Sequence, residues 1–276
     1  MIPKVIHYCW FGRGEKPDII KKCIENWKTM LPDFEIIEWN EDNFDVNMYD
    51  YTKEAYGLGK WAFVSDVARL WVVYNYGGLY MDTDVEILQK TDYLYDYPAF
   101  FACQNEITVN TGYGFGAEKN HWLVKEMLDD YKDRKLIVNG KPNLTPCTVF
   151  CTDLLNRLML ECNIILKSKT IKDILFISCH DYNSMFYHYS TGTWGAKPNL
   201  SGNKRKWKDS PLKRFFRNEK RLKRILNHYG TRRYKIYIFF AYDFLERGIF
   251  FYIKLLFKKI FCRKRRNKKT NSNKNN

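Results

Sequence analysis

The segment Lys60–Val85, KWAFVSDVARLWVVYNYGGLYMDTDV, constrains this chain more than any other stretch. Its apolar residues recur at helical spacing as far as Gly77–Gly78, and a short apolar run then leads to Asp82 and Asp84. A glycine pair is typical of a helix C-terminus followed by a sharp turn. The segment therefore predicts a helix, a glycine turn and a strand that ends in two carboxylates.

The two aspartates are separated by a single threonine, and Asp66 and Arg69 lie three residues apart upstream. Side chains two residues apart in an extended chain point to the same side, so we expect both carboxylates on one side of a strand end. Such a pair forms a hard-oxygen site for a divalent cation. Asp66 and Arg69 share one face of a helix that is apolar almost all round, which predicts a buried charged pair. Buried charges need a partner or a ligand, so the pattern indicates a metal and nucleotide-sugar site.

The order and spacing of these residues resemble the signature of the DXD-containing sugar-binding glycosyltransferases, glycosyltransferase family 32. The glucosylating domains of large clostridial toxins are distant relatives of that family. The N-terminal IPKVIHYCWFG (Ile2–Gly12) resembles the family's opening strand. The resemblance extends over residues 1–195 and implies an α/β fold of the GT-A type with a mainly parallel central sheet. The matching positions are Ser65-Asp66, Arg69, Gly77-Gly78, Tyr80 and Asp82-Thr83-Asp84.

The resemblance also implies a role for each member of this set. Asp84 would ligate Mn²⁺ or Mg²⁺, and Asp82 would lie closer to the ribose and the donor sugar. A cation at this place neutralises the charge that a diphosphate leaving group gains as its bond breaks. Asp66 would accept hydrogen bonds from sugar hydroxyls, and Arg69 would donate them. The alternative for Asp82 and Asp84 is a solvated turn at a strand end. The alternative for Asp66 and Arg69 is a solvated ion pair of little energetic value.

Two further positions concern the donor. Trp10 lies at the end of the first predicted strand, and ligands of α/β sheets bind beyond the carboxyl ends of strands. The resemblance favours stacking of uracil on Trp10, and a core tryptophan is the alternative. The glycine-rich Val109–Gly116 (VNTGYGFG) predicts a loop where backbone approaches a ligand, and Asn110 is a candidate contact to the transferred sugar.

The segment His188–Trp194 (HYSTGTW) resembles the C-terminal element of the same family. The resemblance implies that a residue of this region completes the metal shell, and a neutral imidazole of His188 can do so. His180 is the competing candidate. Trp194 would cover the pyrophosphate as a lid residue.

Hydrophobic periodicity places further elements along the chain. Helical patterns alternate with strand patterns, which predicts a layered α/β domain with a mainly parallel sheet. The expected strands are 4–11, 34–39, 99–103 and 174–178, and the expected helices include 17–30, 122–131 and 152–160.

Charge divides the chain. Residues 1–199 hold 21 Lys and Arg against 27 Asp and Glu, a net charge of −6, whereas residues 200–276 hold 25 against 4, a net charge of +21. We therefore expect a catalytic domain at 1–200, a basic amphipathic helical segment for membrane association at 201–266 and a disordered tail at 267–276.

The stretch Ile236–Phe261 is strongly apolar, but charged residues interrupt it too often for the ~18 apolar residues that a membrane-spanning helix needs. Its charges form a narrow stripe, which predicts an interfacial helix, and Arg263–Lys269 (RKRRNKK) would anchor it to anionic lipid. A helix packed on the globular domain is the alternative. Nucleic acid is a poorer partner, because the aromatic residues do not interleave with the charges.

Together these features predict a metal-dependent retaining glycosyltransferase, a hexosyl- or N-acetylhexosaminyltransferase that uses a nucleotide sugar. UDP-sugars are favoured, with a saccharide or lipid-linked oligosaccharide acceptor in bacterial surface polysaccharide synthesis. No secretory signal is visible, so we expect a cytoplasmic protein, peripheral on the inner face of the plasma membrane. One alternative is a catalytically inactive GT-A-like membrane-bound scaffold or carbohydrate-binding subunit. Another is a sugar-phosphate or nucleotidyl transferase.

Overall fold

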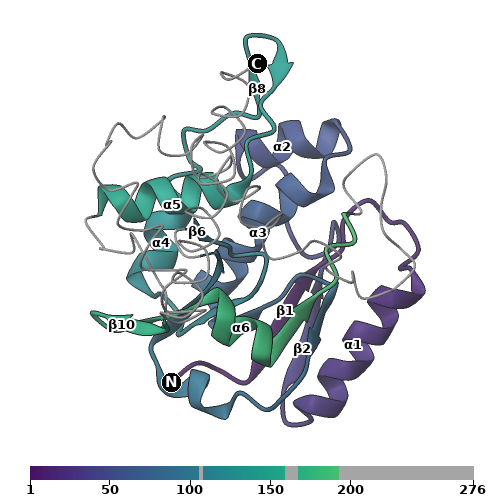
Figure 1. Cartoon of the computed structure of the whole chain (residues 1–276). Helices are drawn as coiled ribbons and strands as arrows, with labels where there is room; N and C mark the ends of the chain where they lie inside the picture. Colours follow the sequence, from purple (N-terminus) through teal and green to yellow (C-terminus); the bar gives the residue numbers. More distant parts are fainter. Residues whose placement is uncertain (106–107, 159–166, 193–276) are drawn as a thin grey trace, which may run out of the picture. The chain divides into compact units, whose positions relative to one another are not determined.

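The computed structural model describes residues 1–105, 108–158 and 167–192 (Figure 1). A central sheet of eight strands crosses this part of the chain in the order β10-β11-β5-β7-β3-β1-β2, with β6 added beside β5. These strands are β1 (Val5–Cys9), β2 (Glu35–Trp39), β3 (Gly78–Tyr80), β5 (Ala99–Asn105), β6 (Thr108–Val109), β7 (Phe115–Ala117), β10 (Lys169–Ile171) and β11 (Ile174–Ile177).

Most of the sheet runs in one direction. The strand β1 pairs in parallel with both β2 and β3, and β5 pairs in parallel with β11. Because β7 is antiparallel to both β3 and β5, the strands β2, β1, β3, β5 and β11 all point the same way, while β6, β7 and β10 point the other way. The predicted α/β class with a mainly parallel central sheet is confirmed.

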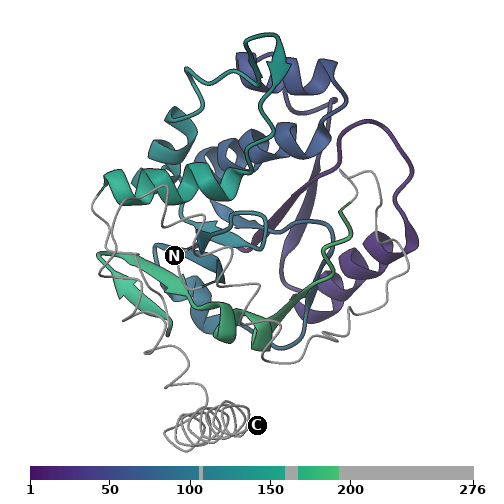
Figure 2. The same ribbon diagram turned by 45° about the horizontal axis from the view of Figure 1, so that its top comes forward.

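Helices cover both faces of the sheet (Figures 1 and 2). Successive strand residues face opposite layers: Phe101 and Phe176 belong to one buried cluster, whereas Phe100 and Ile177 belong to the other. The first layer contains α2 (Asp50–Gly57), α3 (Trp61–Tyr76), α4 (Trp122–Asp129) and α5 (Cys147–Arg157). The second contains α1 (Asp18–Met30), the 3₁₀ helix η1 (Asp92–Asp96) and α6 (Cys179–Met185).

Local sequence signals account for the two helices that matter most. The helix α1 begins directly after Pro17, whose fixed backbone angle suits a helix start. The helix α3 ends at Tyr76, and Gly77 takes a left-handed conformation with φ of 68°. A side chain at Gly77 would also collide with Pro3, because its Cβ would lie 2.8 Å from the proline ring. Both boundaries follow the predicted pattern.

Two predicted boundaries were wrong. The expected helix 152–160 begins earlier, at Cys147, because Pro146 starts it and the buried Cys147 and Phe150 extend its apolar face. The glycine-rich 109–116 is not a loop throughout, because β7 crosses its end between β3 and β5. Gly116 permits this close approach, since a Cβ there would lie 2.6 Å from the ring of Phe100.

Two short ladders lie outside the central sheet. The strands β8 (Ile137–Val138) and β9 (Lys141–Pro142) form an exposed hairpin. The strands β4 (Val85–Ile87) and β12 (Phe186–His188) pair antiparallel and place His188 opposite Val85. The indole of Trp27 on α1 donates to the carbonyl of Val85 at 2.7 Å, which ties β4 to the helix behind it.

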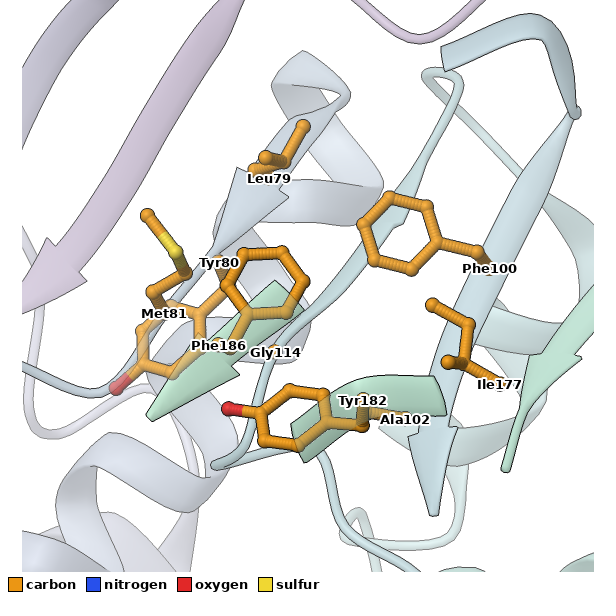
Figure 3. Close-up of a pocket in the computed structure, with 9 residues that line it drawn as sticks. All are labelled: Leu79, Tyr80, Met81, Phe100, Ala102, Gly114, Ile177, Tyr182 and Phe186. Carbon is orange, nitrogen blue, oxygen red and sulfur yellow. The ribbon is translucent and has the colours of Figure 1, made fainter. Parts of the chain in front are cut away.

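A small apolar cavity lies between the sheet and α6 (Figure 3). Phe100 and Ile177 line it from the sheet, and Tyr182 and Phe186 line it from α6 and β12.

No helix within the described ranges is long and apolar enough to cross a membrane. The predicted membrane-association segment 201–266 and the predicted tail 267–276 lie outside the described residues, so the proposed domain boundaries stay predictions.

Candidate functional site

Arg69 lies between two carboxylates at the centre of the site. Its Nη2 atom is 3.0 Å from Oδ1 of Asp66 and 3.6 Å from Oδ1 of Asp82, and its Nε donates to the carbonyl of Ser65 at 3.0 Å. Asp66 is 7% exposed and Arg69 is 4% exposed. The predicted buried pair is therefore confirmed, and the alternative of a solvated surface pair is wrong.

Tyr80, the last residue of β3, supports this arrangement from below. Its hydroxyl donates to Oδ1 of Asp82 at 3.0 Å, and its ring lies 4.8 Å from the guanidinium carbon of Arg69. A cation over an aromatic face is attracted by the ring quadrupole. The tyrosine thereby orients both partners of the Arg69–Asp82 pair.

Asp82 and Asp84 do not lie on an extended strand, and this part of the prediction was wrong. They belong to a turn between β3 and β4, in which the amide of Val85 donates to the carbonyl of Asp82 at 3.1 Å. Strand alternation therefore does not bring the carboxylates together. Each of them instead faces His188, which arrives from β12.

Three ligand atoms converge at this turn. His188 Nε2 lies 3.4 Å from Asp84 Oδ1 and 3.7 Å from Asp82 Oδ2, and the ligand atoms of the three residues all lie within 4.8 Å of one another. Carboxylates and an imidazole suit Mn²⁺ and also tolerate other first-row divalent cations. The donor set fits the predicted cation, and we call these three residues the Asp82–Asp84–His188 trio.

Hydrogen bonds from Ser190 and Thr191 orient two members of the trio, His188 and Asp84. The backbone amide and the hydroxyl of Thr191 both donate to Oδ2 of Asp84, at 2.7 Å and 2.8 Å, while Oδ1 faces His188. The amide of Ser190 donates to Nδ1 of His188 at 2.9 Å. A neutral ring whose Nδ1 accepts this bond carries its proton on Nε2, toward the carboxylates.

Burial and neighbouring charges shift the pKa values of three ionisable groups at the site. Burial raises the pKa of Asp66 to about 6, although nearby Arg69 opposes the shift. Burial would also raise the pKa of Asp82, but Arg69, His188 and Tyr80 outweigh it and lower that pKa below its usual value. Burial would lower the pKa of His188, but Asp84 and Asp82 raise it instead. The site therefore favours an ionised Asp82.

The remaining predicted residues have different fates. Trp10 follows β1, which lies parallel to β3, so Trp10 and Asp82 leave the same edge of the sheet. Trp10 is half-buried and its indole donates to the carbonyl of Gly14 at 2.7 Å. The stacking of uracil on Trp10 stays a prediction. Trp194 lies outside the described residues.

Asn110 and the two histidine candidates are also placed. Asn110 Oδ1 accepts from the amide of Gly112 at 2.8 Å, and Gly112 borders Asp82 and Arg69, so the predicted asparagine lies at the site. His180 is exposed on α6, whereas His188 belongs to the trio. The geometry therefore favours His188 over His180 as the nitrogen ligand.

Sequence reasoning missed four residues that shape the site: Tyr80, Gly112, Tyr113 and Thr191. Tyr80 was part of the family signature without a role. Thr191 lies within the HYSTGTW element, three residues after His188, and its partner Asp84 is 107 residues away. In the sequence, only the resemblance of the HYSTGTW element to the family pointed to this region.

A buried arginine between carboxylates, beside an Asp-Asp-His trio at the strand ends, suits an anionic, hydroxyl-bearing ligand with a divalent cation. Residues 17–101 match the family model described as the glycosyltransferase sugar-binding region containing the DXD motif. Asp66, Arg69, Asp82 and Asp84 all lie within the matched stretch. Over these residues the predicted resemblance to the DXD-containing glycosyltransferases is confirmed.

Two curated relatives are inositol phosphoceramide mannosyltransferases of Schizosaccharomyces pombe. Mannosyltransferase 3 is 32% identical over 111 residues, covering 36% of this chain and 29% of the relative. Mannosyltransferase 2 is 33% identical over 106 residues, covering 36% of this chain and 30% of the relative. The chain thus matches less than a third of the length of these relatives.

Solved structures that match this chain are more remote in sequence. The PaToxG glycosyltransferase is 16% identical, with a TM-score of 0.44 over 58% of this chain and 70% of that chain. A glycosyltransferase involved in glycosylation of the major capsid of PBCV-1 is 8% identical, with a TM-score of 0.38 over 70% of this chain and 95% of that chain.

Proposed function

We propose that this chain is a divalent-metal-dependent glycosyltransferase with a GT-A-type fold, which transfers a sugar from a nucleotide sugar to a saccharide or lipid-linked acceptor. The observation that carries the proposal is the placement of the Asp82–Asp84–His188 trio directly beside the buried Asp66–Arg69 pair, with Arg69 Nη2 3.6 Å from Asp82 Oδ1. A cation site next to a hydrogen-bonding pocket is the arrangement that a diphosphate-linked sugar requires.

The sugar side of the site consists of Asp66, Arg69 and Asp82. Arg69 carries several N–H donors in a fixed plane and bridges both carboxylates, so it can donate to a sugar oxygen without changing its own position. The carboxylates accept hydrogen bonds from hydroxyl groups. Because Asp66 and Arg69 are buried, each of these bonds would form away from competing water.

The cation side would use Asp82 Oδ2, Asp84 Oδ1 and His188 Nε2. A bound Mn²⁺ or Mg²⁺ supplies positive charge that stabilises the diphosphate leaving group. His188 would ligate only through an unprotonated Nε2, so its neutral ring would then carry the proton on Nδ1. In that tautomer Nδ1 would donate to Oγ of Ser190, which lies 3.1 Å away, in place of accepting from the amide of Ser190. Thr191 keeps Asp84 Oδ1 directed toward that position throughout.

The reaction would retain the anomeric configuration. The carboxylates near the sugar are already engaged with Arg69 or the trio, so no separate nucleophile is assigned. Attack of the acceptor from the face of the departing diphosphate, with the leaving phosphate accepting its proton, requires none. A glycosyl–protein adduct trapped during turnover and detected by mass spectrometry would contradict this route.

Donor and acceptor are narrower questions. Trp10 at the end of β1 supports a uridine donor by stacking, whereas the two curated relatives are named as mannosyltransferases of inositol phosphoceramide. Mannose donors therefore belong in any panel beside other hexose and N-acetylhexosamine donors. A sphingolipid acceptor deserves testing beside the lipid-linked oligosaccharides of bacterial surface polysaccharide synthesis.

The decisive experiment measures nucleoside diphosphate release from UDP- and GDP-sugars with Mn²⁺ or Mg²⁺, with and without EDTA. The Asp84→Asn variant keeps the shape of the side chain and removes its charge. The matched control is Asp42→Asn, because Asp42 is an exposed aspartate paired with Arg13 on the surface. We expect one donor to be consumed in a chelator-sensitive manner, with at least ~100-fold loss in Asp84→Asn and none in the control.

Two other outcomes decide the alternatives. Metal-dependent donor binding without turnover, even with acceptors supplied, would favour the catalytically inactive carbohydrate-binding subunit. Product analysis separates a sugar-phosphate or nucleotidyl transferase, because only glycosyl transfer releases the free nucleoside diphosphate. Absence of both binding and turnover would reject the proposed function.

The basic segment adds a proposal about location. With a net charge of +21 over residues 200–276, we propose peripheral binding to the anionic inner face of a plasma membrane. Flotation with anionic liposomes tests it, and deletion of residues 236–276 should abolish the binding. Equal flotation of the full chain and the deletion variant would contradict it.

A further inference from the structure

We propose that the turn Asn110–Tyr113 is a positioning element, which fixes the sugar-binding side chains Asp82 and Arg69 relative to the cation ligand His188. We call it the positioning turn. It contacts Asp82 and Arg69 through Gly112, and it contacts His188 through Tyr113. The inference rests on the proposed function, because it assigns this turn to the same donor and cation site.

The turn is itself anchored by hydrogen bonds. The backbone N–H of Asn110 donates to the carbonyl of Ala102 on β5 at 2.9 Å. Its side-chain oxygen accepts from the amide of Gly112 at 2.8 Å, and its carbonyl accepts from the amide of Tyr113 at 3.2 Å. An asparagine that binds the backbone two residues on makes a compact local turn. The sheet therefore fixes where Gly112 and Tyr113 lie.

The side chains of Asp82 and Arg69 lie directly against Gly112. A Cβ atom at this position would lie 2.5 Å from Oδ2 of Asp82 and 2.8 Å from Nη1 of Arg69. The amide of Asp82 also donates to the carbonyl of Gly112 at 3.2 Å. Gly112 is therefore required for space, so that the carboxylate and the guanidinium can approach the backbone.

The cation side is held by aromatic stacking. The ring of Tyr113 lies 4.7 Å from the His188 ring at an interplanar angle of 28°. Tyr182 stacks on Tyr113 at 5.0 Å and donates from its hydroxyl to the carbonyl of Tyr113 at 2.6 Å. Phe186 then stacks on Tyr182 at 5.1 Å.

These rings form a column from the site to the core. Tyr182 and Phe186 also line the apolar cavity beneath it (Figure 3). Stacked aromatic rings gain more than their buried area alone contributes, so the column resists rotation of the His188 imidazole. The orientation of Nε2 toward Asp82 and Asp84 therefore depends on Tyr113.

The two contacts together give the turn its role. Asp82 and Arg69 come from residues 66–84, whereas His188 comes from β12. The positioning turn touches both groups, so it sets the spacing between the sugar-binding side chains and the nitrogen ligand. Ligands must be held within a small tolerance for both binding and transfer.

Tyr113 is tested with Tyr113→Leu and Tyr113→Phe. The His188 ring protons, assigned by their loss in His188→Gln, report the stacking directly by NMR in the presence of EDTA. We expect an upfield ring-current shift in the wild type and in Tyr113→Phe, and its loss in Tyr113→Leu. In parallel, the Kd for Mn²⁺ should weaken about tenfold in Tyr113→Leu and recover in Tyr113→Phe.

An unchanged His188 resonance in Tyr113→Leu, or an unchanged Mn²⁺ affinity, would overturn the role of Tyr113. The NMR measurement needs neither metal nor donor. A wild-type chain that binds no Mn²⁺ would therefore reject the proposed function while the stacking is still decided by the spectra.

Gly112 is tested with Gly112→Ala, using Gly57→Ala as the matched control because a Cβ at Gly57 meets no atom within 4 Å. We expect Gly112→Ala to bind the nucleotide sugar at least about tenfold more weakly, with little change for the nucleoside diphosphate alone. Far-UV circular dichroism checks that both variants fold. Equal loss for both ligands, or no loss, would overturn the role of Gly112. If Gly112→Ala does not fold, the Tyr113 variants still decide the proposal.

Discussion

Thr191 donates two hydrogen bonds to Asp84, one from its backbone amide at 2.7 Å and one from its hydroxyl at 2.8 Å. Both bonds end on Oδ2, and the other oxygen of this carboxylate faces His188 at 3.4 Å. A residue 107 positions away in sequence thereby decides which oxygen of Asp84 is presented to a cation.

Replacement of Thr191 by valine should weaken metal binding. The variant keeps the size of the side chain and the backbone amide, but it removes the hydroxyl that restrains Asp84. Loss of such a supporting bond costs about 10- to 100-fold in metal affinity. Titration with Mn²⁺ followed by isothermal calorimetry measures the change.

The control for Thr191 is Thr191→Ser, which restores the hydroxyl without the methyl group. We expect its Kd for Mn²⁺ to remain close to the wild-type value. Equal weakening in the serine and valine variants would mean that packing of the methyl group, not the hydrogen bond, orients Asp84.

Asp66 should make the protein less stable as the pH rises from about 4 to about 6. Its pKa is raised by burial from 3.8 to about 6, so the unfolded state loses this proton first and its free energy falls relative to that of the folded state. The cost is absent below pH 4 and complete above pH 6, and at about 1.4 kcal/mol per pKa unit it amounts to at most about 3 kcal/mol. Asp66→Asn should therefore gain stability relative to the wild type across this window.

Urea unfolding of both proteins at pH 4, 5, 6 and 7 in EDTA measures that difference. Because both proteins share their remaining ionisable groups, most other titrations cancel. A stability difference that stays constant between pH 4 and pH 7 would show that Asp66 titrates near its ordinary value in the folded protein.

Loss of the Tyr80 hydroxyl should impair turnover more than folding. Tyr80→Phe keeps the ring beneath Arg69 but removes the donor to Asp82 Oδ1, so the pKa of Asp82 is lowered less. We expect about tenfold slower release of nucleoside diphosphate and an acid limb of the pH–rate profile that moves to higher pH.

The comparison for Tyr80 is Tyr95→Phe, which removes a buried hydroxyl that contacts Thr91 away from the site. Its rate and pH profile should match the wild type. If Tyr80→Phe also retains the wild-type acid limb, then its hydrogen bond does not tune Asp82.

Asn26 on α1 should stabilise β4, the strand that pairs with β12. Its side chain accepts from the amide of Ile87 at 2.8 Å and donates to the carbonyl of Ile87 at 3.1 Å. Two such bonds contribute about 1–3 kcal/mol together. Asn26→Ala should lower the free energy of unfolding by this amount in urea titrations. It should also weaken Mn²⁺ binding, because β4 pairs with β12, the strand that carries His188.

Asn47→Ala is the reference for Asn26, since Asn47 is exposed and bonds only to nearby Asp45. A surface change of this kind should stay within about 0.5 kcal/mol. Similar destabilisation by both variants would indicate that the Asn26 contacts to β4 contribute nothing specific.

Several elements could be predicted because their signals are local. The helix α3 shows its periodicity, its glycine stop and the three-residue spacing of Asp66 and Arg69 within one continuous stretch. The strands β1, β2 and β11 fall within the runs of apolar residues that predicted them, and β5 begins at the predicted Ala99 but extends two residues beyond the predicted end, to Asn105. Burial of the Asp66–Arg69 pair followed from the same periodicity, since nearly every neighbour on the helix is apolar.

Other features were out of reach because they depend on pairing between distant segments. The insertion of β7 between β3 and β5 depends on the close packing that Gly116 permits. The aspartates meet in a turn, which two-residue strand alternation does not describe. Tyr113 gained its role only when β12 brought His188 against its ring.

The sequence by itself determined the helices α1 and α3, the strands β1 and β2, the buried Asp66–Arg69 pair and, with the family resemblance, the residues of the candidate cation site. Periodicity and spacing act over a few residues, so a single chain records them. The tertiary structure decided that His188, and not His180, lies beside Asp82 and Asp84 at the candidate cation site. It alone showed that Thr191 bonds one oxygen of Asp84 and that the positioning turn contacts both Asp82 and His188. Those contacts arise from the pairing of β4 with β12, which links residues about a hundred positions apart and leaves no local pattern in the sequence.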